Sequence, residues 1–239
     1  VPVIADDYHL DSLFPNAISK AFSYQGSYQA QDTLRNGIGF WIKYPSANVV
    51  YFTGINIARE TVDVADKWNI IGPPSFPVRA ANITPLGPTT RVSEFFGYSS
   101  ATGYSTEDTL NPGYAYWVRM NGAGRLALDT VTPVTRPALD RPGIKDFNTV
   151  MFRDAEQRQR TLLFSSRTAD LDLSRYELPP IPPEGMDVRY GSNRFVEMAD
   201  RNNSKTVPVL ISSVAWPVEV EWKFTDNGDK VTLIVDDRE

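Results

Sequence analysis

The sequence predicts an all-β protein in which a duplicated small antiparallel β unit is followed by a β-sandwich-like module. Short stretches rich in Val, Ile, Thr, Tyr, Phe and Trp are separated by 18 prolines and by frequent Gly, Asn and Asp. This alternation is typical of strands joined by turns. No stretch of helical length keeps an apolar period of 3.6 residues without meeting Pro or Gly. A third observation supports the duplication: one unusual sequence motif, called here the repeated phrase, occurs twice.

The repeated phrase is DTLRNGIGFWIK, which begins at Asp32, and DTLNPGYAYWVR, which begins at Asp108. Both copies place Asp-Thr-Leu before an Asn, a Gly, an apolar run with a Trp, and a base. The matched positions are Tyr28 with Tyr104, Leu34 with Leu110, Gly37 with Gly113, Trp41 with Trp117, and Lys43 with Arg119. This spacing predicts two copies of one structural unit: a first repeat over residues 1–62 and a second repeat over residues 63–135.

Within each repeat, residues 37–44 and 113–120 are expected to be strands that follow a tight turn at a glycine. Alternation places Trp41 and Trp117 on one face of these strands. The residues expected on the opposite face are Ile38, Phe40, Ile42, Tyr114, Tyr116 and Val118.

Upstream, the second repeat contains KWNIIG at 67–72, for which the first repeat has no counterpart. Aligning Val1–Val3 with Phe76–Val78 predicts that the first repeat lacks its first strand and leaves an open strand edge. Two explanations remain: a trimmed or incomplete chain, or a strand donated by another protein chain.

The remaining residues, 136–239, form the predicted β-sandwich-like module, which follows a linker at residues 132–143. TVMFRDAEQRQRTLLF (149–164) and VEVEWKFTDNGDKVTLIV (218–235) are predicted hairpins. Between them, ELPPIPPEG (177–185) cannot be a central strand, because proline cannot donate to a strand ladder.

Composition limits the classes of partner. The net charge of −5 and the scattered bases disfavour nucleic acid and anionic membranes as main partners. The absence of cysteine excludes disulfides and thiolate metal sites, and the apolar runs are too short for a membrane span.

No catalytic constellation is found. The single histidine, His9, lies in DDYHLDS, and neighbours in sequence seldom form a catalytic triad in space. The carboxylates Asp170, Asp172, Asp226 and Asp229 have no calcium-loop spacing. We therefore expect no catalytic residue, no metal and no cofactor. A hydrolase with two converging acids is the third-ranked alternative.

Tyrosines in polar stretches are the remaining binding candidates: Tyr24, Tyr28, Tyr98 and Tyr104. Rings on an exposed β face stack on sugars, which predicts a carbohydrate-binding or adhesive module. The competing interpretation is that the same rings are half-buried packing residues.

The phrases KWNIIG, SLFPNAISKAFSY, DTLRNGIGFWIK and DTLNPGYAYWVR resemble β modules of surface and secreted proteins exported by the type IX pathway of the Bacteroidetes–Chlorobi group. YELPPIPPEGMDVRYGSNRFVE resembles the β module that precedes the sorting domain in such proteins. The resemblance implies a bacterial extracellular or cell-surface location, and the neighbouring domains of a parent chain as partners. It also implies O-glycosylation sites of the form Asp-Ser/Thr-apolar, at Ser12, Thr33, Thr109 and Thr130.

The function expected from the sequence is therefore a non-enzymatic extracellular structural, spacer or assembly segment of a larger protein. A carbohydrate-binding module that uses the four tyrosines is the alternative.

Overall fold

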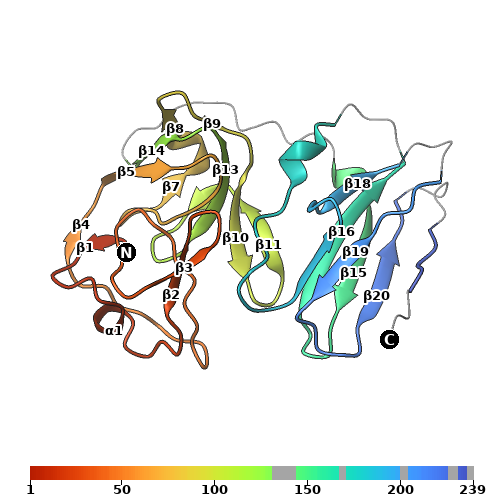
Figure 1. Cartoon of the computed structure of the whole chain (residues 1–239), viewed down its shortest axis with the longest axis horizontal. Helices are drawn as coiled ribbons and strands as arrows, with labels where there is room; N and C mark the ends of the chain where they lie inside the picture. The colour runs from red at the N-terminus through yellow and green to blue at the C-terminus, as the bar shows by residue number, and fades with distance from the viewer. Residues whose placement is uncertain (131–143, 167–170, 200–203, 226–230, 236–239) are drawn as a thin grey trace. The chain divides into compact units, whose positions relative to one another are not determined.

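The computed structural model describes residues 1–130, 144–166, 171–199, 204–225 and 231–235. The chain is all-β, as predicted, with several antiparallel sheets and one four-residue α-helix among the described residues (Figure 1). It divides into an N-terminal unit, Val1–Asp140 with Leu178–Gly185, and a C-terminal unit, Arg141–Glu177 with Met186–Glu239. The predicted linker, residues 132–143, lies outside the described residues.

The N-terminal unit contains β1 to β14. Their bounds are β1 Val3–Ile4, α1 Leu10–Leu13, β2 Ala21–Tyr24, β3 Tyr28–Gln31, β4 Ile55–Asn56, β5 Arg59–Val64, β6 Lys67–Ile71, β7 Val78–Arg79, η1 Ala80–Asn82, β8 Ile83–Leu86, β9 Thr90–Arg91, β10 Phe95–Ser99, β11 Gly103–Glu107, β12 Thr109–Leu110, β13 Tyr116–Asn121 and β14 Gly124–Asp129. Strand β5 crosses the boundary that the sequence predicts between residues 62 and 63.

Strand β6 has a neighbour on each edge. On one edge it pairs with β13, where Ile70 lies opposite Trp117. On the other edge the Gly39 amide donates to the Ile70 carbonyl at 3.1 Å, and the Gly72 amide donates to the Gly37 carbonyl at 2.9 Å. Strand β6 therefore contacts the GIGFW stretch of the first repeat (residues 37–41) as well as the matching stretch of the second repeat.

The pairing continues outward on both sides. Trp41 forms an antiparallel bridge to Phe22 of β2, and β2 pairs with β3. In the second repeat Trp117 lies opposite Phe96 of β10, and β10 pairs with β11. Each tryptophan segment is thus flanked in its sheet by the hairpin that precedes it in the chain.

The predicted open edge of the first repeat is wrong, because β6 of the same chain occupies it. The proposed alignment of Val1–Val3 with Phe76–Val78 is also wrong. β7 pairs with β12, whereas Val3 pairs with Asn56 of β4 and it is His9 that bridges Thr33. A shared Pro-Val pair is too short to fix a register. A strand from another chain is not needed at this edge.

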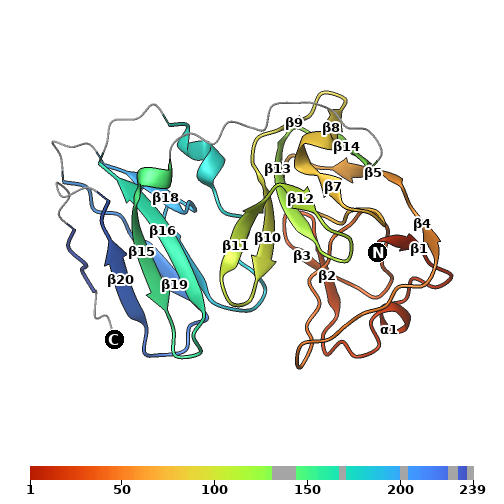
Figure 2. The same cartoon turned by 180° about the vertical axis from the view of Figure 1, so that it is seen from behind.

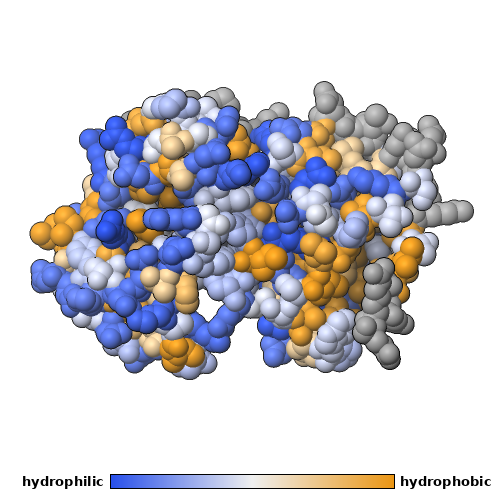
Figure 3. Space-filling view, in the orientation of Figure 1, coloured by the Kyte–Doolittle hydropathy of each residue, from blue (hydrophilic) through white to orange (hydrophobic). Residues whose placement is uncertain are grey.

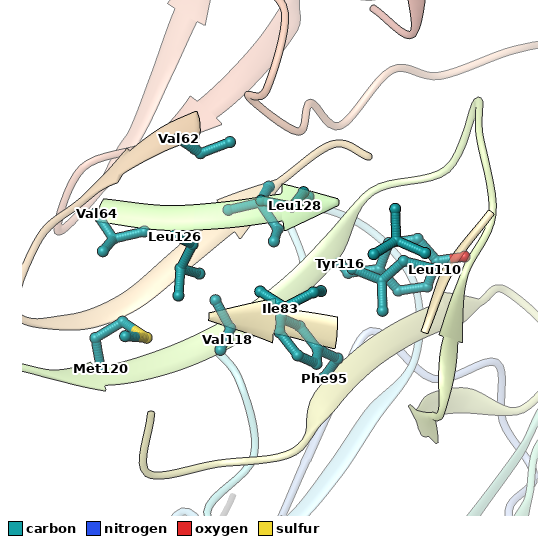
Figure 4. Packing of buried hydrophobic residues seen from close by; sticks show 12 residues of the cluster. Val62, Val64, Ile83, Phe95, Leu110, Tyr116, Val118, Met120, Leu126 and Leu128 are labelled. Atoms are coloured by element: carbon teal, nitrogen blue, oxygen red, sulfur yellow. The ribbon is translucent and has the colours of Figure 1, made fainter. Parts of the chain in front are cut away.

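Among the described residues of the N-terminal unit, apolar side chains form a larger cluster and a separate smaller one. Tyr116 and Val118 belong to the larger one, shown in Figure 4, and Phe40 and Ile42 pack against the smaller one, as their alternation predicts. The larger cluster comprises Val62, Val64, Ile71, Val78, Ile83, Phe95, Leu110, Tyr116, Val118, Met120, Leu126 and Leu128. Burying each such side chain contributes about 1.5–3 kcal/mol.

Tyr114 is an exception to the predicted alternation. It is 69% exposed, because it sits in the turn at Gly113, whose φ is +83°, and its amide donates to Asn111. The regular strand β13 begins only at Tyr116.

The C-terminal unit contains η2 Ile144–Asp146, β15 Asn148–Arg153, β16 Gln159–Ser165, η3 Leu173–Tyr176, β17 Asp187–Tyr190, β18 Val196–Met198, β19 Val209–Ser212 and β20 Glu219–Lys223. One sheet has the order β18-β16-β15-β20, with β16 and β18 parallel, and a second sheet pairs β17 with β19. Their apolar faces share one cluster, which includes Val150, Leu162 and Val188. This is the predicted sandwich-like architecture.

The first predicted hairpin of the C-terminal unit is confirmed, since β15 pairs with β16. The second is not formed as predicted: β20 pairs with β15, and residues 231–235 are exposed and belong to no strand. Its turn lies outside the described residues. Figure 3 shows apolar side chains gathered over part of this unit, whose exposed apolar residues include Leu210, Ile211 and Trp216.

Within the described residues, no helix is long and apolar enough to cross a membrane.

Candidate functional site

The four tyrosines selected from the sequence lie on two hairpins of the N-terminal unit. Tyr24 lies directly opposite Tyr28 in the β2–β3 pair, and Tyr98 lies opposite Tyr104 in the β10–β11 pair. Their ring centroids are 5.4 Å and 5.2 Å apart, with edge-to-face geometry. Directly opposed residues are the closest side-chain neighbours in an antiparallel pair, which explains both contacts.

Each tryptophan of the repeated phrase packs against tyrosines of the other repeat. The Trp117 ring lies 5.0 Å from Tyr24, and the Trp41 ring lies 4.7 Å from Tyr98. Trp68, from the shared strand β6, contacts Trp117 at 6.4 Å. We call these residues the aromatic cluster: Tyr24, Tyr28, Trp41, Trp68, Phe96, Tyr98, Tyr104 and Trp117. Each such aromatic pair is worth about 0.5–1.5 kcal/mol beyond the area it buries.

The aromatic cluster is largely shielded from solvent. Trp117 is 1% exposed, all four tyrosines are half-buried, and burial raises the pKa of Tyr24. The indole Nε1 atoms of Trp41 and Trp117 are buried and have no hydrogen-bond partner among the described residues. These tyrosines fit the packing interpretation better than that of an open sugar-binding face.

A proline-rich segment lies against the aromatic cluster. We call Leu178–Gly185 the strap; its sequence is LPPIPPEG, and it belongs to the N-terminal unit. The Tyr104 hydroxyl donates to the Pro180 carbonyl at 2.7 Å, and the Tyr28 hydroxyl donates to the Ile181 carbonyl at 2.9 Å. The matched tyrosines of the two repeats therefore hold adjacent carbonyls of one segment. Figures 1 and 2 show the strap beside β11.

Two prolines of the strap that are three residues apart are buried. Pro179 and Pro182 are buried, whereas Ile181 and Pro183 are exposed. The backbone bends at Pro180 and again at residues 183–185, so the strap is an irregular segment whose two buried prolines flank the first bend. Leu178, at the start of the strap, is also buried.

The carboxyl end of the strap is fixed by a glycine and by a charge. Gly185 has a φ of +99°, and a Cβ at this position would lie 2.6 Å from the Tyr98 hydroxyl oxygen. Only glycine fits there without displacing the tyrosine. Glu184 forms an ion pair with Lys43 of the first repeat.

His9 is exposed and is the N-cap residue of α1, and no hydrogen bond of its imidazole is found in the described part of the chain. It borders a hollow of about 420 Å³ together with Asp11, Lys20 and Asp32, but Lys20 and Asp32 form an ion pair. Ser12 donates its hydroxyl to Asp7 instead of to His9. No catalytic triad is assembled here.

Two of the buried carboxylates of the C-terminal unit, Asp187 and Asp154, are used in structural contacts. Asp187 accepts two hydrogen bonds of 2.7 Å from Arg189. Asp154 accepts from Arg158 at 2.6 Å and from the Ala215 amide at 3.1 Å. Burial alone would raise the pKa of Asp154, but these hydrogen bonds lower it to about 2. Both carboxylates are thus saturated by neighbours.

Of the other acids considered from the sequence, Asp172 caps η3 by accepting from the Ser174 amide. Asp170, Asp226 and Asp229 lie outside the described residues. Among the residues that are described, no three His, Asp or Glu side chains are grouped closely enough to hold a metal ion.

The predicted glycosylation positions differ in accessibility. Ser12 and Thr33 are exposed. Thr109 is half-buried in β12, and the Thr130 hydroxyl donates to the Ala58 carbonyl at 2.8 Å. The first two are the more accessible to a modifying enzyme.

The sequence indicated the tyrosines but not their partner. The Pro-Pro-x-Pro-Pro pattern predicts an extended segment, yet nothing in the pattern says which surface it meets.

Comparison with models of known protein families, with curated proteins and with solved structures finds no match for this chain. The resemblance to type IX exported proteins therefore stays a prediction.

Proposed function

We propose that this chain is a non-enzymatic structural segment of a larger exported protein, and that its N-terminal unit serves to hold a proline-rich segment. The observation that carries the proposal is the pair of hydrogen bonds from Tyr104 and Tyr28 to the adjacent carbonyls of Pro180 and Ile181. Both donors are matched positions of the two repeats, four residues before the repeated phrase begins. The cluster thus acts as a clamp for extended backbone.

The two repeats together explain how the clamp is formed. Each repeat supplies one hairpin and one tryptophan, and each tryptophan packs against the other repeat's tyrosines. A single repeat would supply only one of the two hydroxyl donors. Two copies are therefore needed to hold two successive carbonyls.

Export and surface location rest on the resemblance to type IX modules, whose phrases cover most of the chain. In that setting a structural segment would connect or space neighbouring domains of its parent. The half-buried tyrosines, two of whose hydroxyls already donate to the strap, leave little free surface for a sugar ring.

Hydrogen–deuterium exchange of the strap amides tests the proposal. Replacing both tyrosines, in Tyr28→Phe/Tyr104→Phe, keeps the rings but removes the two donors. We expect faster exchange at Ile181 and Glu184 than in the unaltered chain. The matched control is Tyr114→Phe, because Tyr114 is 69% exposed and away from the strap's hydrogen bonds. Unchanged exchange in the double variant would contradict a clamping role.

The non-enzymatic part of the proposal is tested separately. Assays on peptides, esters and polysaccharides should show no turnover above background. If turnover is observed, His9→Ala should leave it unaltered, because the imidazole is exposed and lies in no assembled triad. Loss of turnover in this variant would make His9 catalytic.

A further inference from the structure

We propose that the aromatic cluster is a polyproline-binding site, able to bind in trans a peptide with prolines at positions i and i+3 followed by an acidic residue. The chain's own strap is then a built-in competitor for the site. This inference rests on the proposed function, and it adds the class of ligand.

The first argument is the way in which the strap's backbone is recognised. Proline has no amide hydrogen, so a proline-rich segment makes few internal hydrogen bonds and its carbonyls can accept from a partner. Tyr104 and Tyr28 supply donors to two successive carbonyls, those of Pro180 and Ile181. These contacts use only the main chain, and any peptide with the same backbone path can form them.

The second argument is the burial of the prolines. Pro179 and Pro182 are three residues apart and both are buried, whereas Ile181 between them is 48% exposed. The two buried prolines therefore face the protein, and Ile181 between them faces solvent. Proline at the buried positions lowers the entropy lost on binding, because its φ is already fixed. Aromatic surfaces are a common partner for such segments.

The third argument concerns direction. The ion pair between Lys43 and Glu184 lies at the carboxyl end of the strap. A peptide bound in reverse would place its acidic residue at the other end, away from Lys43. The charge therefore selects one orientation, although an exposed pair of this kind adds little affinity.

The strap is covalently attached to the chain that carries its site. A tethered ligand acts at an effective concentration in the millimolar range, which a free peptide must exceed. The unaltered protein should thus bind such peptides weakly, and a protein with a weakened strap should bind them at least about tenfold more tightly.

The test uses the full chain and the synthetic peptide ELPPIPPEG, which copies Glu177–Gly185. In the chain, Pro179→Ser/Pro182→Ser weakens the strap. Peptide titration is followed by tryptophan fluorescence, with retention of the fold checked by circular dichroism. We expect saturable binding, and at least about tenfold weaker binding by the unaltered chain. A peptide with alanine at the two buried proline positions should not bind.

A second variant covers the case in which the proline variant fails to fold. Glu184→Lys changes an exposed side chain, so the fold should be retained, and it opposes Lys43 with a like charge. This variant should bind the peptide more tightly than the unaltered chain does. When Lys43→Glu is added to this variant, the preference between two peptides should reverse. The double variant should bind a peptide with lysine in place of its second glutamate more tightly than it binds ELPPIPPEG.

Absence of peptide binding at millimolar concentration by a folded strap variant overturns the inference. Equal binding of the alanine peptide overturns it too, since the site would then not select proline. A different result would contradict the proposed function, namely an unchanged rate of hydrogen–deuterium exchange at the strap amides in Tyr28→Phe/Tyr104→Phe. The two failures are therefore distinguishable.

Discussion

At the scale of single residues, Tyr28 and Tyr104 hold the strap through their hydroxyls, which donate to the carbonyls of Ile181 and Pro180. Their matched positions, four residues before each copy of the repeated phrase, follow from the sequence. Their hydrogen-bond acceptors do not, because the strap is distant in the chain and no local pattern encodes the contact.

The first prediction concerns these hydroxyls. Tyr28→Phe and Tyr104→Phe should each lower the free energy of unfolding by about 0.5–1.5 kcal/mol, the net value of a hydrogen bond. Chemical denaturation measures this loss, and Tyr114→Phe serves as the control. A loss no larger than that of the control would mean that water replaces the tyrosine hydroxyls at no cost.

The second prediction concerns Asp154, whose side chain is fully buried. Its pKa is lowered from 3.8 to about 2, so the charged form is favoured in the folded state. The stability that it contributes is fully present above the unfolded pKa and is lost as the pH falls through the folded pKa. The free energy of unfolding of the unaltered chain should therefore decrease as the pH is lowered from 3.8 to about 2.

Asp154→Asn is the variant for this test. It should be less stable than the unaltered chain at neutral pH, and its stability should depend less on pH between 3.8 and about 2. An equally steep decline in the variant would assign the acid sensitivity to other carboxylates.

At the scale of elements, the β15–β16 hairpin and the strand around Tyr116–Asn121 could be predicted, because both combine alternation with a turn. The neighbour of the GIGFW stretch could not. A free edge was predicted for the first repeat, since the repeat pattern assigns KWNIIG to the second repeat only. The pattern shows which side chains share a face, but not that one strand can pair on both edges.

Gly39 provides the third prediction, at the junction of GIGFW with β6. A Cβ at this position would lie 2.7 Å from Ile70 and 2.8 Å from Ala115. Gly39→Ala should therefore destabilise the chain by about 1–3 kcal/mol, the usual cost of overpacking. Denaturant titration measures it.

Gly97→Ala is the matched control for Gly39→Ala, because its new methyl group would meet only the flexible side chain of Glu107, at 3.2 Å. The cost there should be much smaller. Equal costs at the two glycines would mean that the close packing of Gly39 against β6 is not what makes this position sensitive.

At the scale of the whole molecule, the sequence predicted the all-β class and a sandwich-like module near the carboxyl end. It did not predict that the strap, which the chain reaches after η3 and leaves before β17, would belong to the N-terminal unit. Such an assignment depends on contacts between distant segments, which composition and periodicity do not reveal.

The fourth prediction follows from this assignment. We consider replacing the strap by a glycine–serine segment of the same length. This should lower the melting temperature of the N-terminal unit, because the prolines that are buried are removed and the hydrogen bonds from Tyr28 and Tyr104 are weakened. Calorimetry that resolves the transitions of the two units measures this shift. The same replacement at residues 45–49, which are exposed, should have little effect.

Strand β6 also limits how this sequence can have been rearranged by recombination. Because β6 pairs with β13 on one edge and with the GIGFW stretch on the other, a breakpoint between the two repeats removes a neighbour from it. The surviving half would expose a bare strand edge, which favours aggregation. Although the repeated phrase suggests two modules, genes that carry it are expected to gain or lose both halves together.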